Sequence, residues 1–268
     1  MTASLIAPNR TREALADGKA VLGTMLAELR QPAVMQLLVN AGFDFVIIDN
    51  EHGPFNIETI ADLSRTAVYL GLTPIVRVPA IDYPYIAQAL DGGAQGIMAP
   101  RILTVEQVVQ VVNTVKYPPV GQRGCAMSRG HTRFRGGPVS QAMADANLES
   151  LVVIQIETVD AVEAIDEIVA VAGVDVAFIG PNDLSIALGV AGQMTSPVLM
   201  AVIEKVIDAC ARQGVVAAIQ MNDLPLAAQW ASRGIRMLSY SSEIGLLTSA
   251  GASATHTLRE TCQARSPV

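Results

Sequence analysis

The sequence has few of the features that mark secreted, disulfide-stabilised or membrane-spanning proteins. Its 268 residues include only three cysteines, Cys125, Cys210 and Cys262, whose wide spacing suggests neither a disulfide framework nor a zinc cluster. Apolar runs are interrupted by charge or glycine well before the ~18 residues that a transmembrane helix needs. The N-terminal segment also lacks the apolar core of a signal peptide. We therefore expect a soluble, cytoplasmic protein with reduced thiols.

Basic runs and aromatic residues are also scarce. The net charge is −7, only 4% of residues are aromatic, and no cluster of lysine and arginine would form a nucleic-acid surface or a basic membrane-binding face. No P-loop and no nucleophilic serine elbow is present. These absences favour a small molecule as the binding partner.

A repeated local pattern is present instead. An amphipathic run is followed by glycine, then by a few β-prone apolar residues, then by a polar group. Glycine suits the end of a helix because it enters the left-handed region without a Cβ penalty. The pattern predicts strands within residues 20–28, 43–49, 73–79, 95–100, 151–157, 174–180, 215–222 and 235–241.

Helical patterns separate these strands and begin with recognisable signals. Asn56 precedes one helix, Thr104 with Gln107 forms a capping box, and Ser196 is followed by Pro197 at a first helical position. Apolar strands that alternate with helices indicate a parallel sheet covered by helices, and about 250 residues is the size of a TIM barrel. A doubly wound open sheet is the alternative, disfavoured because no G-x-G-x-x-G follows the first strand.

We therefore expect one (β/α)8 TIM-barrel domain over residues 1–268. A glycine-, proline- and arginine-rich stretch fills part of the unusually long interval between the fourth and fifth strands, so we expect a long loop at about 117–150. A helical tail is expected from about residue 243, where the last barrel helix belongs.

In a TIM barrel the chemistry lies at the C-terminal ends of the strands, which makes the polar residues there the candidate site. None of the three lysines, Lys19, Lys116 and Lys205, ends a strand inside the barrel, which argues against a Schiff-base enzyme. The polar residues at or after strand ends are Asp49, Glu51, His52, Arg77, Gln155, Glu157, Asp183, Gln220 and Asn222.

Glu157 and Asp183 end consecutive strands, so their carboxylates can converge on one rim. Two such charges repel unless a cation or a proton lies between them, and oxygen ligands favour a hard ion such as Mg²⁺ or Mn²⁺. The alternative is structural: Asp183 caps the following helix and Glu157 pairs with an arginine.

His52 follows the second strand, three residues after Asp49. Asp49 could hold one ring nitrogen while the other faces the cavity, as a general base requires; the alternative is a structural histidine. Arg77 lies within an apolar strand and must meet either a protein carboxylate or an anionic ligand. We expect His131 to face solvent and His256 to lie far from the site.

Several of these segments together resemble the HpcH/HpaI aldolase family, the metal-dependent class II pyruvate aldolases. The resemblance spans roughly residues 20–245, and QIET followed by FIGPNDLS at this separation is highly specific. The segments are FDFVIIDNEHGPFN, VRVP, LDGGAQGIMAPRI, YPPVGQRG, VVIQIET and GVDVAFIGPNDLSIALG.

The resemblance implies a lyase that reversibly cleaves a 4-hydroxy-2-oxo acid to pyruvate and an aldehyde through a metal-stabilised enolate. It assigns Glu157 and Asp183 to Mg²⁺, Mn²⁺ or Co²⁺, and assigns His52 as the base with Asp49 orienting it. It places Arg77 against the pyruvyl oxygen, with Gln155 and the backbone around Pro181 and Asn182 also binding substrate.

Further features follow from the family rather than from the residues themselves. The last helix is expected to be exchanged between subunits within a hexamer. The loop after YPPVGQRG would contact the aldehyde, and Arg123, Arg129, Arg133 and Arg135 could favour an acidic acceptor or simply be solvated. A citrate-lyase-like acyl-CoA lyase and a non-catalytic pyruvate- or oxalate-binding barrel remain alternative functions.

Overall fold

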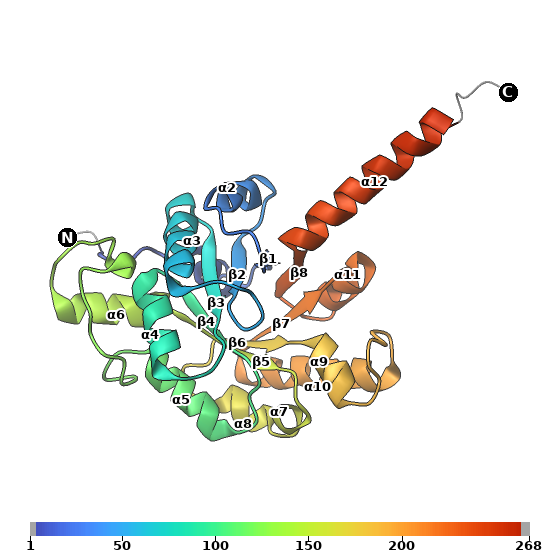
Figure 1. Ribbon diagram of the computed structural model, residues 1–268. Helices are drawn as coiled ribbons and strands as arrows, with labels where there is room; N and C mark the ends of the chain where they lie inside the picture. Colours follow the sequence, from blue (N-terminus) through green and yellow to red (C-terminus); the bar gives the residue numbers. More distant parts are fainter. Residues whose placement is uncertain (1–3, 264–268) are drawn as a thin grey trace.

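The structure, a computed structural model, describes residues 4–263 and contains a closed barrel of eight parallel strands in sequence order (Figure 1). This confirms the predicted TIM barrel and its eight strand segments. The strands are β1 (Val21–Leu26), β2 (Phe45–Asp49), β3 (Thr73–Arg77), β4 (Gly96–Ala99), β5 (Leu151–Ile156), β6 (Val176–Ile179), β7 (Val216–Met221) and β8 (Met237–Ser242).

Helices surround the barrel on its outer side. They are α1 (Arg10–Ala16), α2 (Ala33–Asn40), α3 (Ile57–Leu70), α4 (Tyr83–Gly92), α5 (Val105–Val115), η1 (Gly130–Thr132), α6 (Val139–Glu149), α7 (Val159–Glu163), α8 (Ile165–Ala170), α9 (Pro181–Ala187), α10 (Pro197–Gln213), α11 (Leu224–Ser232) and α12 (Glu243–Gln263). Within residues 4–263 no helix combines the length and the apolarity needed to cross a membrane.

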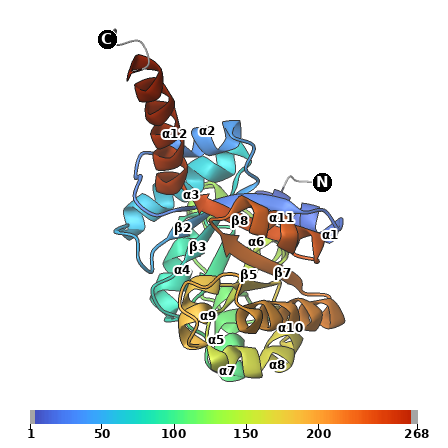
Figure 2. The same ribbon diagram turned by 90° about the vertical axis from the view of Figure 1, so that its right-hand side faces the viewer.

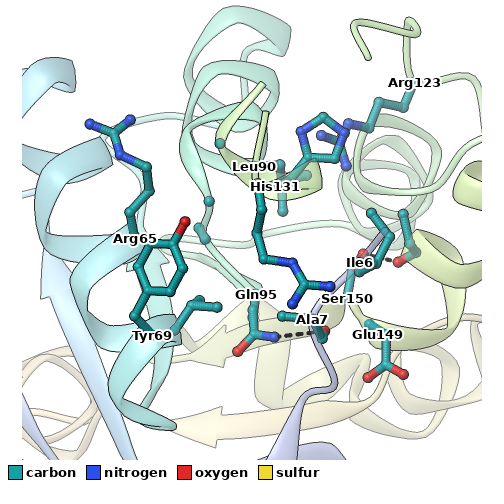
Figure 3. Close-up of a pocket in the computed structure, with 16 residues that line it drawn as sticks. Ile6, Ala7, Arg65, Tyr69, Leu90, Gln95, Arg123, His131, Glu149 and Ser150 are labelled. Atoms are coloured by element: carbon teal, nitrogen blue, oxygen red, sulfur yellow. Dashed lines mark hydrogen bonds between the residues drawn. The ribbon is translucent and has the colours of Figure 1, made fainter. Parts of the chain in front are cut away.

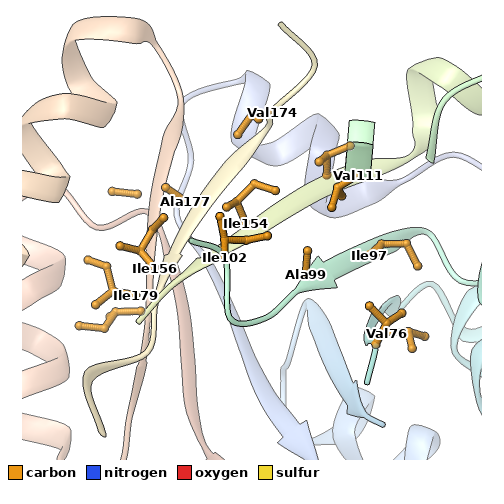
Figure 4. Close-up of a cluster of buried hydrophobic side chains, with 14 of the residues drawn as sticks. Val76, Ile97, Ala99, Ile102, Val111, Ile154, Ile156, Val174, Ala177 and Ile179 are labelled. Atoms are coloured by element: carbon orange, nitrogen blue, oxygen red, sulfur yellow. The ribbon is translucent and has the colours of Figure 1, made fainter. Parts of the chain in front are cut away.

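Most strands are apolar on both faces because they separate two apolar layers, whereas β8 (MLSYSS) is polar and only partly buried in its second half. Along β2, Phe45 and Ile47 point into the barrel, whereas Val46 and Ile48 pack against the helices. The outer layer is the larger, and Figure 4 shows part of it between the strands and α5. Near-continuous burial on both faces explains why the strands read as unbroken apolar runs.

Local signals set the helix boundaries as expected. The side chain of Asn56 accepts a hydrogen bond from the amide of Thr59 at the start of α3, and Thr104 and Gln107 form the capping box of α5. Pro197 begins α10, but Ser196 makes no side-chain capping bond. Gly71 ends α3 in the left-handed region at φ 79°. The sequence therefore specifies these ends locally.

The barrel interior is closed tightly at its N-terminal end. A Cβ on Gly23 would lie 2.4 Å from the ring of Phe45, so β1 and β2 pack closely only because this residue is glycine. Leu15 of α1 joins the same interior cluster. Helix α1, which the sequence pattern did not indicate, thus helps to cover the end opposite the candidate site.

The interval 117–150 is partly helical. Residues 133–138 carry no regular element, but η1 precedes them and α6 occupies Val139–Glu149. Part of the expected loop is therefore a helix that packs against the N-terminal segment, with Ala146 in one cluster with Ile6 and Tyr117.

Helix α12 leaves the barrel and projects away from it (Figures 1 and 2). Its base is anchored because the buried carboxylate of Glu243 accepts hydrogen bonds from the amides of Ala27, Glu28 and Leu29. Every residue from Leu247 to Gln263 is exposed. The helix therefore begins where the last barrel helix was expected but does not cover the barrel of its own chain.

Candidate active site

A cavity of about 180 Å³ opens at the C-terminal ends of the strands. Its floor is apolar and is formed by Met25, Ile47, Met98 and Phe178. Its polar wall consists of His52, Arg77, Gln155, Asn182, Asp183 and Gln220, with Gly180 and Pro181 between them. A small polar group held over an apolar floor is typical of a small-molecule site.

Arg77 is held by two carboxylates at the start of this wall. The parallel register places Asp49 beside Arg77, and the guanidinium donates from Nε and Nη2 to the two carboxylate oxygens at 2.9 and 2.7 Å. Nη1 also lies 3.1 Å from Glu51 Oε2, an ion pair without hydrogen-bond alignment. The guanidinium therefore meets protein carboxylates and still faces the cavity.

Asp49 does not contact the His52 ring in the way that the sequence suggested. Its Oδ1 accepts the backbone amides of Glu51 and His52, at 3.0 and 3.3 Å, while both oxygens bind Arg77. The carboxylate nearest the ring belongs to Glu51, at 3.9 Å from His52 Nε2. Asp49 therefore positions His52 through the backbone, because its oxygens are needed to compensate the buried guanidinium.

Glu157 is buried beneath the rim and is firmly oriented. Its Oε1 accepts the amide of Arg101 at 2.7 Å, and its Oε2 accepts Nε2 of Gln155 at 2.5 Å. Burial raises the pKa of Glu157, and the charges of Glu51 and Asp183 raise it further. The amide of Arg101 and the charge of Arg77 lower this pKa, but not enough to offset burial and the neighbouring carboxylates.

Asp183 lies in the first turn of α9, where it lines the cavity. The N-cap of α9 is Gly180, with no side-chain capping bond, so a capping role does not account for Asp183. A Cβ on Gly180 would lie 3.0 Å from Nε2 of Gln155 and 3.1 Å from Oε2 of Glu157. Glycine at this position therefore lets the strand pass close to the two side chains.

The donor set fits a hard divalent cation. Asp183 lines the cavity and Glu157 lies near it at the end of the neighbouring strand, so both can supply carboxylate oxygens. The buried Oε1 of Gln155 has no hydrogen-bond partner within the described residues. Residues 4–263 contain no group of three or more His, Cys, Asp or Glu side chains that could hold a metal. A metal here would therefore take its other ligands from water or substrate, as Mg²⁺ commonly does.

Several residues that help to form the site were not selected as site residues from the sequence. The ion pair of Glu51 with Arg77 and the amide of Arg101 on Glu157 both depend on tertiary register. Gln220 lies at the end of β7, donates to the carbonyl of Ser241 at 2.9 Å and leaves its buried Oε1 without a partner in the described chain. Only Glu51 and Gln220 gave a sequence signal, as polar residues at strand ends.

The arginine-rich loop does not reach this cavity within the chain. Arg123 is buried and pairs with Asp91 at 2.5 Å, and Arg133 donates to the carbonyls of Ser4 and Leu5. The expectation that His131 faces solvent is wrong, because its side chain is only 7% exposed. These residues pack beside the N-terminal ends of the strands, so an acidic-acceptor role for them finds no support in the chain.

Comparisons with known proteins give matches over most of the chain. The family model described as HpcH/HpaI aldolase/citrate lyase matches residues 24–250. The chain is 33% identical to a hydroxypyruvate/pyruvate aldolase of Roseobacter denitrificans, covering 91% of this chain and 95% of that protein. It is 35% identical to a 4-hydroxy-2-oxovalerate aldolase of Novosphingobium aromaticivorans, covering 86% and 87%.

A solved structure extends the likeness to three dimensions. The crystal structure of an HpcH/HpaI aldolase from Desulfitobacterium hafniense superposes with a TM-score of 0.89 at 36% identity, covering 93% of this chain and 96% of that one. Sequence and fold therefore agree over nearly the whole chain.

Proposed function

The chain belongs to the HpcH/HpaI aldolase/citrate lyase family, and from this premise we propose how its site works. It is an aldolase, a carbon–carbon lyase that cleaves a 4-hydroxy-2-oxo acid reversibly to pyruvate and an aldehyde. We infer that Glu157 and Asp183 hold Mg²⁺, Mn²⁺ or Co²⁺. The observation that carries this inference is that Asp183 lines one cavity with Arg77 and His52, while Glu157 lies close enough to Asp183 and Arg77 for their charges to shift its pKa.

A divalent ion bound there would supply positive charge to polarise the ketone of the substrate. Arg77 supplies further positive charge from the protein itself. Two of its N–H groups are occupied by Asp49, and the others on Nη1 and Nη2 make no hydrogen bond within residues 4–263. These groups can donate to the ketone oxygen as negative charge develops on it, which lowers the barrier rather than only strengthening substrate binding.

His52 is the proposed base. It lines the cavity, and its ring is 69% exposed, so it can reach the hydroxyl of a bound substrate. Removal of the 4-hydroxyl proton lets the C3–C4 bond break, which gives the aldehyde and leaves the electron pair on the pyruvate fragment. Proton return to C3 completes pyruvate, and the reverse sequence forms the bond.

The remaining polar groups seat the substrate. Pro181 has no N–H and can only fix the turn at the start of α9, so the amide of Asn182 is the proposed donor to the substrate carboxylate. Gln155 is fixed by its bond to Glu157, which leaves its Oε1 for a polar group of the substrate.

Pyruvate release in chelator tests the metal assignment. EDTA should abolish cleavage of a 4-hydroxy-2-oxo acid, and Mg²⁺ or Mn²⁺ should restore it, whereas full activity in chelator would exclude the proposed site. The same assay with a CoA thioester distinguishes an acyl-CoA lyase, and metal-dependent pyruvate binding without turnover would indicate a binding protein.

His52→Ala should lower kcat by about 10²-fold or more if His52 is the base.

Helix α12 is proposed to pack on a second copy of the chain. Its exposed part includes Leu247 and Leu258, which are 69% and 64% exposed. Most helical stability in proteins comes from packing of an apolar face, and this part of α12 packs against nothing in the described part of its own chain. A homo-oligomer, hexameric as the family resemblance suggests, would supply that packing. Sedimentation of the full chain and of a chain ending at residue 246 should show loss of the assembly in the latter.

A cytoplasmic location stays a prediction from the sequence.

A further inference from the structure

A second cavity lies far from the catalytic groups. It is formed by the C-terminal ends of α3, α4 and α6, by η1 and by the N-terminal segment, and it borders Gln95 and Ser150, which directly precede β4 and β5 (Figure 3). Strand β5 leads from this end of the barrel to Glu157, and its six residues span roughly 20 Å at about 3.3 Å per residue. The two cavities therefore lie at opposite ends of the barrel.

The polar lining of this cavity is mainly cationic. Arg65, Arg123 and Arg133 face it, and Glu149 is the acidic residue among the lining residues. Two of the arginines are paired with carboxylates outside the lining, Arg65 with Asp62 and Arg123 with Asp91. The Glu149 carboxylate accepts the amide of Asn9 at 2.6 Å.

Arg133 has no carboxylate partner within residues 4–263. It donates only to the carbonyls of Ser4 and Leu5, and so does its neighbour Arg135. Burial lowers the pKa of Arg133, and the charge of Arg135 lowers it further. Arg133 therefore lies at the cavity without a compensating carboxylate in the described chain, and Arg135, which does not line the cavity, adds a second positive charge nearby.

Unused hydrogen-bonding capacity is buried beside them. The His131 side chain is 7% exposed, and neither ring nitrogen makes a well-aligned hydrogen bond within the described residues, although the backbone of Asp91 lies close to the ring. Nε of Arg123 is buried without a partner as well, and Figure 3 shows the two side chains next to each other. Asp91 lies 4.0 Å from Nδ1 of His131, too far for a hydrogen bond. Buried polar atoms without partners usually mark the place of a bound water, ion or ligand.

The other walls are apolar, formed by Ile6, Val68, Leu90, Ala94 and Ala146. The cavity has a volume of about 40 Å³, which holds roughly three water-sized groups at about 10–15 Å³ each and therefore has room for a carboxylate group. It is partly open to solvent, so a short chain attached to that group can extend along the apolar walls toward the opening.

We propose that this cavity is a binding site for a small monocarboxylate with a short apolar chain. The carboxylate is bound by Arg133, His131 and Nε of Arg123, and the chain lies against the apolar wall. This site is distinct from the catalytic cavity and does not depend on the aldolase reaction.

Calorimetric titration of the full chain with propionate at constant ionic strength tests the proposal. Arg133→Gln should weaken binding by about tenfold or more, as expected for loss of a charge-assisted hydrogen bond. Arg135→Gln is the matched control, because Arg135 contacts the same carbonyls of Ser4 and Leu5 but does not line the cavity; binding should change less than about twofold. His131→Phe, which keeps the ring and removes both nitrogens, provides a second variant that should also lose affinity.

Arg77→Lys separates this site from the catalytic cavity. Propionate binding that survives Arg77→Lys and is lost in Arg133→Gln supports the proposal. Binding that is lost in Arg77→Lys and unchanged in Arg133→Gln, or no binding to the wild type, overturns it. Equal losses in Arg133→Gln and Arg135→Gln would also overturn it, because they would indicate a general effect on the N-terminal segment. Tighter binding of inorganic phosphate than of propionate would overturn the carboxylate assignment.

Discussion

The buried pairing of Arg77 with Asp49 permits a prediction in which one substitution has opposite effects in two backgrounds. The side chains of Arg77, Asp49 and Glu51 are 9%, 5% and 9% exposed. Arg77→Met leaves both carboxylates buried without a cation, and breaking a buried ion pair in this way costs about 3–5 kcal/mol. Asp49→Asn in the wild type should cost less, about 1–3 kcal/mol, because Glu51 still faces the guanidinium and the oxygen of the introduced amide can accept one N–H.

In the Arg77→Met background the effect of Asp49→Asn on the free energy of unfolding should change sign. Asp49→Asn then removes an uncompensated buried charge while keeping an oxygen for the amides of Glu51 and His52, so it should raise the free energy of unfolding. The expected coupling is about 2 kcal/mol or more between two side chains in direct contact.

Urea unfolding at fixed protein concentration measures these differences, followed by the fluorescence of Trp230, the only tryptophan and fully buried. Glu51→Gln serves as a second substitution and should also stabilise Arg77→Met. If Asp49→Asn destabilises Arg77→Met as much as it destabilises the wild type, then the carboxylate is not compensated by Arg77 and the reasoning is wrong. Arg77→Met and the double variant Arg77→Met with Asp49→Asn should both lack aldolase activity whatever their stability.

Three further predictions concern stability and site geometry. Burial lowers the pKa of Lys116 to about 8 from 10.5, so between these values the unfolded chain binds more protons and stability rises with pH. The free energy of unfolding of the wild type relative to Lys116→Met should therefore increase by up to about 3 kcal/mol from pH 8 to 10.5, and a constant difference would contradict this. Gly180→Ala should displace Gln155 and Glu157 by a few tenths of an ångström and lower kcat by about tenfold with little change in Tm, measured by pyruvate release and thermal unfolding. Gly23→Ala should cost about 1–3 kcal/mol in urea unfolding through overpacking against Phe45, and wild-type stability would show that the ring can move freely.

Most of the fold could be predicted because its signals are local. Glycine after each amphipathic run, apolar strands and capping residues such as Asn56 and Thr104 are visible over a few residues, and a count of eight limits the topology to a barrel. The strand-end residues of the site followed from the general position of active sites in such barrels. The projection of α12 could not follow from its own sequence, because an exposed helix and a packed one share the same helical pattern.

The partners of each site residue were less accessible from the sequence. Asp49 is three residues from His52 along the chain, yet its carboxylate pairs with Arg77, 28 residues away, because the register of β2 and β3 places them side by side. His131 has the sequence context of a loop histidine and is buried only because η1 packs against the end of α4. Side-chain pairing depends on register and packing, which no short segment encodes.

The charges around the candidate active-site cavity predict the order in which ligands bind. Asp49, Glu51, Glu157 and Asp183 contribute four carboxylates, and Arg77 is the cation that faces them, so the group carries −3 when all are ionised and His52 is neutral. Pyruvate is an anion and would be repelled by this group, whereas a divalent cation changes its charge to about −1 and offers the carboxylate a direct partner. We therefore expect pyruvate to bind only after the metal. Calorimetry in chelator should give no detectable heat with pyruvate, and adding Mn²⁺ should restore binding in the wild type but not in Glu157→Gln. Pyruvate binding of equal strength in chelator would mean that Arg77 and the start of α9 suffice to hold the anion, and the metal would then act only on the chemical step.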